Sequence, residues 1–119
     1  MSNTESLTLT DYVLPAVDPG QAPIVVIRFS GSLVKAVQFD LISLVGQILG
    51  RYFDHVAILD LRGVEMDETI QDTIKGLIAS FNRRLKGVII SPETAPSVKE
   101  ELYRMHRDRW IDLHELSSQ

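Results

Sequence analysis

Three apolar runs, rich in β-branched residues and separated by two segments of helical period, most constrain the fold of this chain. The runs are Ile24–Phe29 within PIVVIRFSG, residues 55–61 (HVAILDL) and residues 87–91 (GVIIS). Nearly continuous apolar runs of this length are typical of strands buried on both faces of a parallel sheet. Between them, at about residues 35–52 and 68–84, apolar side chains recur every three or four positions, as on one face of an amphipathic helix. Strands that alternate with helices predict an α/β fold.

Further elements flank this alternation. Thr8–Leu14 is predicted as a first strand, which forms a hairpin with the next across the turn residues VDPGQ. Residues 97–107 have the period of a third helix, and WIDLHEL (residues 110–116) favours a last short strand. The expected order is β-β-α-β-α-β-α-β, with right-handed crossovers and a mostly parallel sheet whose central strand is HVAILDL. We expect residues 1–7 to form a flexible N-terminus and residues 8–119 a single domain.

The helical periods also predict which side chains enter the core. They are Val37, Leu41, Leu44, Val45, Ile48 and Leu49 in the first helix, Ile70, Ile74, Leu77, Ile78 and Phe81 in the second, and Val98, Leu102 and Met105 in the third. The aromatic residues Phe53, Tyr103 and Trp110 are also expected in the core, with contacts between copies of the chain as the alternative.

Composition and charge restrict the function. The net charge is −4, which argues against nucleic acid or an anionic membrane as the main partner, because both attract basic surfaces. The chain has no cysteine and its three histidines lack the spacing of metal ligands, so we expect neither a metal nor another cofactor. The polar start does not resemble a signal peptide and no apolar run has the length of a membrane span, which favours a cytoplasmic protein.

Sequence motifs of catalysis are missing as well. The chain has no G-x-S-x-G elbow, and FSGSLVK (residues 29–35) lacks the glycine spacing of both nucleotide-binding fingerprints. We therefore expect a protein that is not an enzyme.

One acidic stretch remains, where the strand that ends near Asp60 leads through a predicted turn, Arg62 to Asp67, into the second helix. Asp60 is a candidate phosphoacceptor, because ILDLRGVEMD resembles the corresponding stretch of receiver domains. That chemistry needs a magnesium ion bound by further carboxylates near the end of the first strand, whereas residues 29–31 offer none. Receiver-like phosphorylation of Asp60 is therefore the less favoured interpretation.

The order of elements from about Thr8 to Glu115 resembles the STAS domain, the fold of anti-sigma-factor antagonists and of the scaffold proteins of bacterial stressosomes. The anchors are SGSL (residues 30–33), AILDLRGV (residues 57–64) and the acidic turn MDET (residues 66–69). The family tends to have Gly-x-Leu-Asp at the first anchor, where this chain departs with a valine, and Asp followed by Ser or Thr in the turn. The resemblance implies a non-catalytic binding module, in which a partner kinase phosphorylates that hydroxyl and so switches binding.

The turn is one residue shorter than is usual in that family, which leaves two alignments. If the alignment is counted forward from Asp60, Thr69 takes the position of the family's phosphorylated hydroxyl. If it is counted backward from the strand at residues 88–90, Asp67 takes the position of the family's aspartate and Glu68 that of its phosphoacceptor. We favour the backward count, because a shift of one residue rotates a helix by about 100° and would move its apolar stripe off the core. A carboxylate at Glu68 predicts docking that does not depend on phosphorylation at that position. A plain helix-capping role for Asp67 and Glu68 is the structural alternative.

We expect the start of the second helix to bind regulatory proteins, such as a serine/threonine kinase, an anti-sigma factor or other STAS proteins. The main candidates for this contact are Asp67, Glu68 and Thr69, and the secondary candidates are Asp60, Asp72 and Thr73. Homo-oligomerisation into a scaffold and association with a transporter complex are the alternatives.

Overall fold

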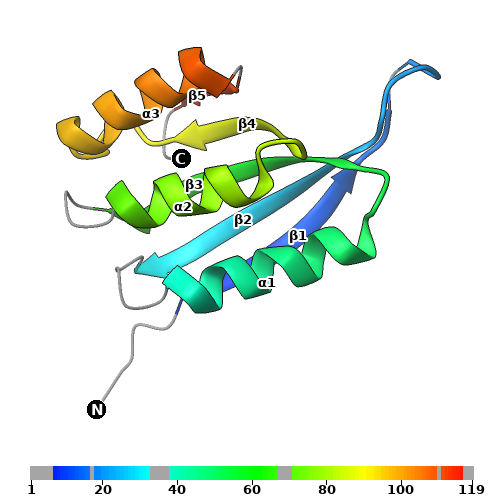
Figure 1. The fold of residues 1–119 in the computed structure, drawn as a ribbon, viewed down its shortest axis with the longest axis horizontal. Coiled ribbons are helices and arrows are strands. Elements are labelled where there is room, and N and C mark those ends of the chain that lie inside the picture. The colour runs from blue at the N-terminus through cyan, green and yellow to red at the C-terminus, as the bar shows by residue number, and fades with distance from the viewer. Residues whose placement is uncertain (1–6, 17, 33–37, 67–70, 110, 117–119) are drawn as a thin grey trace.

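A mixed five-stranded sheet with three helices makes up the fold, seen in a computed structural model that describes residues 7–16, 18–32, 38–66, 71–109 and 111–116 (Figure 1). The elements are β1 (Thr8–Leu14), β2 (Ile24–Ser32), α1 (Gln38–Arg51), β3 (Val56–Glu65), α2 (Gln71–Phe81), β4 (Leu85–Ile90), α3 (Pro96–Arg109) and β5 (Asp112–Glu115). The α/β class expected from the sequence is confirmed.

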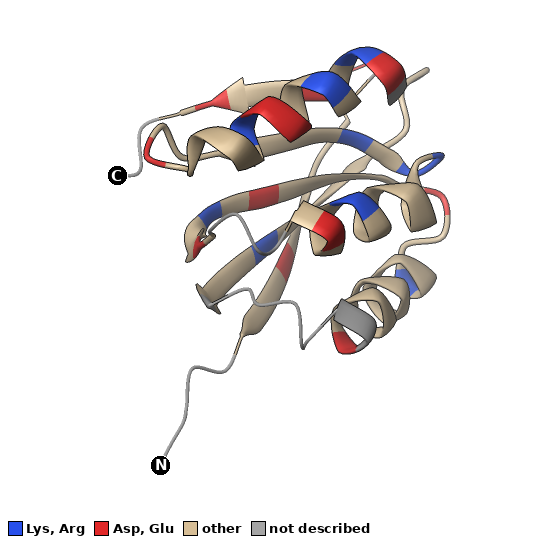
Figure 2. Cartoon of the chain, turned by 60° about the vertical axis from the view of Figure 1, so that its left-hand side comes forward, with Lys and Arg blue, Asp and Glu red and all other residues tan. Residues whose placement is uncertain are grey.

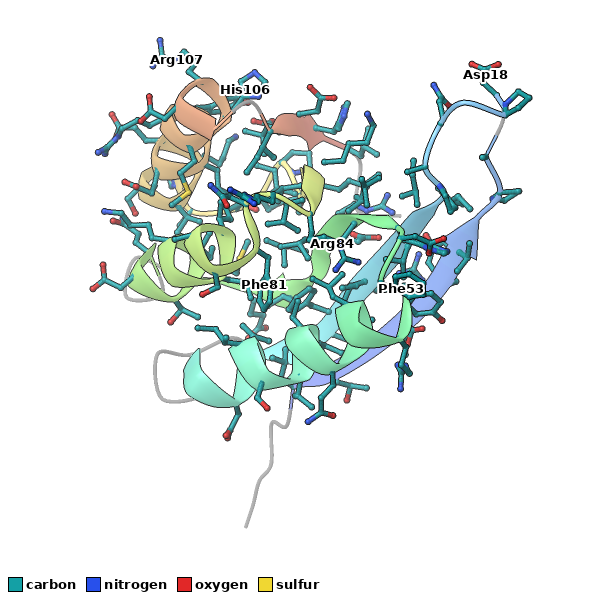
Figure 3. All side chains as sticks on the ribbon, turned by 45° about the vertical axis from the view of Figure 1, so that its right-hand side comes forward. Asp18, Phe53, Phe81, Arg84, His106 and Arg107 are labelled. Carbon is teal, nitrogen blue, oxygen red and sulfur yellow. The ribbon has the colours of Figure 1, made fainter. Side chains whose placement is uncertain are left out.

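The strands lie side by side in the order of the sequence, from β1 at one edge to β5 at the other. β1 and β2 form an antiparallel hairpin, whereas β2, β3, β4 and β5 are parallel to one another. β3 is the central strand, as predicted for HVAILDL. Since each crossover leads to the next strand in the same direction, α1, α2 and α3 cover one face of the sheet, and no described helix covers the other (Figure 3).

The core lies between the sheet and these helices. On β2, β3 and β4, the side chains that face the helices are buried and meet the apolar stripes of the helices in one cluster. Its most enclosed members include Val25, Ile27 and Phe29 on β2, Leu59 and Leu61 on β3, Val88 and Ile90 on β4, Leu41 and Val45 on α1, Leu77 and Ile78 on α2, and Leu102 on α3. Of the predicted inward helix positions that the structure describes, all are buried except Phe81, which is half-buried, and Leu44. Val37, Ile70 and Trp110 lie outside the described residues.

Three side chains predicted to enter the core are exposed instead. Leu44 is 41 % exposed, because it lies at the margin of the apolar stripe of α1. Phe53 is 80 % exposed, since the preceding Tyr52 is the aromatic residue that turns inward at the end of α1. Tyr103 stays at the surface of α3, where its hydroxyl donates a hydrogen bond to Glu115 on β5.

β3 extends further than the sequence suggested. Of the predicted turn Arg62–Asp67, residues 62–65 belong to the strand, and the last three of them face residues 30–32 of β2. The register of this pairing shifts after Arg28, which marks a β-bulge in β3. The local turn signals are therefore overridden by the long-range ladder, and Asp60 lies within the strand rather than at its end.

Gly31, near the end of β2, has a backbone φ of 113°. A side chain with a Cβ is strained in this region, whereas glycine adopts it freely. The glycine thus allows β2 to change direction just beyond the bulge, at the end of the sheet where β3 leads toward α2.

Arg84, in the turn between α2 and β4, closes the opposite end of the sheet (Figure 3). Its Nε donates to the carbonyl oxygen of His55 at 2.9 Å, and its Nη2 donates to those of Tyr52 at 2.5 Å and Leu49 at 3.3 Å. Carbonyl groups at the end of a helix lack partners within the helix and favour a cation. One side chain therefore caps α1 and fixes the turn that leads into β3.

Candidate functional site

The carboxyl ends of β3 and β4 lie at the same end of the parallel sheet, where the chain turns toward α2 and α3. Open parallel sheets bind their ligands at this end, because the connecting turns meet there. A hollow of about 260 Å³, here called the strand-end pocket, is lined by Arg62, Val64, Glu65, Met66, Ser91, Glu93 and Thr94. The end of the sheet from which the chain leads toward α2 is thus hollowed.

The turn after β4 forms one wall of the strand-end pocket. The hydroxyl of Ser91 donates to the carboxylate of Glu93, and the backbone N–H of Glu93 donates back to that hydroxyl at 3.2 Å. The N–H of Thr94 donates to the Ser91 carbonyl oxygen at 3.0 Å. These bonds fix a tight turn and hold Glu93 at the rim, where Glu65 supplies a second exposed carboxylate.

The main predicted site residues, Asp67, Glu68 and Thr69, lie outside the described residues. The strand-end pocket adjoins them along the chain, because Met66 lines the pocket and Asp67 is the next residue. Their part in binding stays a prediction. A partner bound there would also contact the described residues of the strand-end pocket.

Asp60 lies on the face of the sheet opposite the helices, between the inward-facing Leu59 and Leu61. Its carboxylate accepts hydrogen bonds from Nε and Nη2 of Arg62, both at 3.0 Å, and from the Arg62 backbone N–H at 3.2 Å. Arg28 on β2 adds an ion pair at 3.5 Å. A bulge leaves a residue without its ladder partner. The hydrogen bonds to the Asp60 side chain therefore stabilise the bulge, where a neighbouring strand would otherwise supply them.

The electrostatics of Asp60 keep it ionised. Burial raises the pKa of this carboxyl, but the hydrogen bonds from Arg62 and the charges of Arg62 and Arg28 lower it more, so the pKa lies below its ordinary value. The side chain is only 2 % exposed, with both oxygens engaged. Among the described residues, no group of three or more side chains could bind a metal ion beside it. This geometry is that of a structural carboxylate and disfavours attack on a phosphoryl donor.

The two secondary candidates on α2 differ in exposure. Asp72 is exposed in the first turn of the helix, where a negative charge suits the helix dipole. Thr73 is fully buried, and its hydroxyl has no hydrogen-bond partner among the residues that the structure describes. A kinase would reach Thr73 only after the helix had left the core, so Thr73 is a core residue in the folded chain.

Sequence reasoning missed a buried carboxylate on α3. Glu101 contacts Arg104 at 2.9 Å and Lys75 of α2 at 3.5 Å, in a hollow of about 690 Å³ between the two helices. Acidic and basic residues are interspersed along α3, which is the sequence pattern of a solvated helix face (Figure 2). The contact between Lys75 and Glu101 joins two helices, so no local sequence pattern predicts it. In this hollow Glu101 pairs with both Lys75 and Arg104, and the hollow lies away from the start of α2.

No model of a known protein family matches the chain, and none of the curated proteins compared with it matches either. A helix able to cross a bilayer would need more length and more apolar residues than any described helix has. The fold and the strand-end pocket are therefore the basis for a functional proposal.

Proposed function

We propose that this chain is a non-catalytic protein-binding module of the STAS type, which binds a regulatory protein at the start of α2. The observation that carries the proposal is the arrangement of elements: an antiparallel hairpin followed by parallel strands, with helices on one face. This arrangement agrees with the element order that suggested the STAS resemblance. The strand-end pocket supports it further, because it adjoins the turn that the resemblance marks as the partner-binding surface.

The lining of the strand-end pocket favours binding over catalysis. Two of its polar side chains, Ser91 and Glu93, engage each other, and no histidine is among its described lining residues. Val64 and Met66 give it an apolar side, and Glu65 and Glu93 give it an acidic rim. A partner with a basic side chain beside an apolar one would complement this surface in both charge and hydrophobicity.

Charge reversal at the rim tests this surface. We expect Glu65→Lys to weaken binding of the regulatory partner about tenfold, because it replaces an attractive carboxylate by a repulsive cation. The ligand is the purified serine/threonine kinase or anti-sigma factor encoded nearest to the gene, and the measurement is isothermal titration calorimetry. Glu100→Lys on the exposed side of α3 is the matched control, with the same change of charge away from the pocket. Equal affinities of the two variants would refute the proposed surface.

Phosphorylation distinguishes the two alignments of the turn. We expect the kinase and ATP to leave Thr69 unmodified, because Glu68 occupies the phosphoacceptor position. Glu68→Ser restores a hydroxyl there and is expected to gain one phosphate, seen as a mass increase in intact-protein mass spectrometry. Thr69→Ala serves as the control and is expected to behave as the unchanged chain does. Stoichiometric phosphate on Thr69 would instead identify a phosphorylatable STAS switch.

A further inference from the structure

The two edges of the sheet differ in how they are protected. β5 has only four residues and both begins and ends with an acid, at Asp112 and Glu115. β1 has seven residues, pairs with β2 without a shift of register, and contains no proline, lysine or arginine. Proteins normally protect a free edge with short strands, charges, prolines or bulges. In the part of the chain that the structure describes, no strand pairs with the outer side of β1.

The single charge of β1 is neutralised within the chain. The carboxylate of Asp11 accepts a hydrogen bond from the Tyr52 hydroxyl at 2.7 Å and from Arg51 at 3.3 Å. Both donors lie at the end of α1, so Asp11 points to the helix-covered face and not along the edge. The strand therefore offers another strand a neutral edge.

Exposed apolar side chains gather at one end of β1. Tyr12, Val13 and Leu14 are each 40–42 % exposed, and Phe53 is the most exposed of the large apolar residues in the described chain. Phe53 directly follows the two residues that bind Asp11, and it lies close to the hairpin (Figure 3). An unprotected strand edge beside exposed apolar groups is typical of an interaction surface.

We propose that β1 is the interface of a symmetric dimer, in which it pairs antiparallel with β1 of a second copy of this chain. A two-fold axis perpendicular to the sheet joins the two sheets edge to edge and keeps all helices on the same face. Residues that lie opposite each other in an antiparallel pair point to the same face of the sheet. The two-fold axis therefore lies between two copies of the same residue, and each residue of that pair faces its own counterpart in the other chain.

The charge of Asp11 selects the register. An axis at Asp11 would place two carboxylates directly opposite each other, which is unfavourable. An axis at Tyr12 brings the two Tyr12 rings together, sets Thr10 against Leu14 of the other copy, and sets Asp11 against Val13. A second copy fits this edge because it supplies a strand of the same length, with the same neutral edge and the same exposed apolar end.

Sedimentation equilibrium tests the dimer. We expect the mass to rise from 13.4 kDa toward twice that value as the concentration approaches the millimolar range. Tyr12→Lys places two lysines directly opposite each other at the axis and is expected to weaken self-association at least about tenfold. Thr8→Lys is the matched control, because it lies on the same strand outside the paired residues. A constant mass of 13.4 kDa, or equal self-association of Tyr12→Lys and the unchanged chain, would overturn the proposal.

Cysteine cross-linking tests the register, since the chain has no cysteine of its own. We expect an oxidised mixture of Thr10→Cys and Leu14→Cys chains to form a disulfide-linked heterodimer, because these positions lie opposite each other. Neither variant alone is expected to cross-link, because like positions lie about 14 Å apart along the paired strands. A mixture without heterodimer would refute the Tyr12-centred pairing. None of these substitutions lies in the strand-end pocket, so the dimer can fail while the proposed function stands.

Discussion

Arg84→Ala is expected to lower the free energy of unfolding by about 3 kcal/mol, because three carbonyl oxygens lose one charged donor and hydrogen bonds to charged groups contribute about 1.5–3 kcal/mol each. Water reaches the half-exposed site and recovers part of the sum. The measurement is urea denaturation followed by circular dichroism.

Two further variants isolate the geometry of this contact. Arg84→Lys retains the charge without the planar fork, so we expect it to restore only part of the lost stability. Arg83→Ala removes an arginine at the neighbouring exposed position and is expected to change the free energy of unfolding by less than about 0.5 kcal/mol. Equal midpoints for Arg84→Ala and Arg83→Ala would show that the three hydrogen bonds do not stabilise the fold.

Asp60→Asn is expected to destabilise the chain by about 2–3 kcal/mol at neutral pH, because the two arginines lose their buried counter-charge. The pKa of Asp60 in the folded chain lies below its ordinary value of 3.8. Its carboxylate therefore stabilises the fold above that ordinary value, and this contribution disappears as the pH falls through the folded pKa. The difference between Asp60→Asn and the unchanged chain is thus expected to shrink below about pH 4.

The pH dependence is measured by urea denaturation at pH 7 and in acid. Asp18→Asn, at the exposed tip of the hairpin, is the control and is expected to leave stability unchanged at both values (Figure 3). A deficit for Asp60→Asn that is as large in acid as at pH 7 would mean that its charge does not stabilise the bulge.

The period of the apolar residues predicted the helices closely, because a helix packed against a sheet has an apolar residue at every third or fourth position. The predicted helix at about 35–52 is observed as Gln38–Arg51, and the first strand was predicted at its observed bounds, Thr8–Leu14. Local pattern did not predict the extension of β3 through Glu65. Its glycine and charged neighbours are typical of a turn, whereas the strand forms because residues 30–32 supply a ladder from a distant part of the chain.

The candidate site was predictable only in outline. That the ends of β3 and β4 meet follows from a parallel sheet, but Ser91 and Glu93 were not among the predicted site residues because each is ordinary on its own. The role of Asp60 depended on Arg28, whose position opposite it arises from strand pairing. Sequence proximity alone suggested a phosphoacceptor, whereas the cross-strand neighbour makes Asp60 part of the framework.

The order of strands has a consequence for how the chain folds during its synthesis. The β1–β2 hairpin has local contacts, and in the described sheet β3 pairs with β2, β4 with β3 and β5 with β4. No later strand inserts between two earlier ones, so a nascent chain can keep every strand pair that it has made. Such sequential growth limits the kinetic traps that arise when a new segment must displace an old one, and it suits a sheet that emerges from the ribosome one unit at a time.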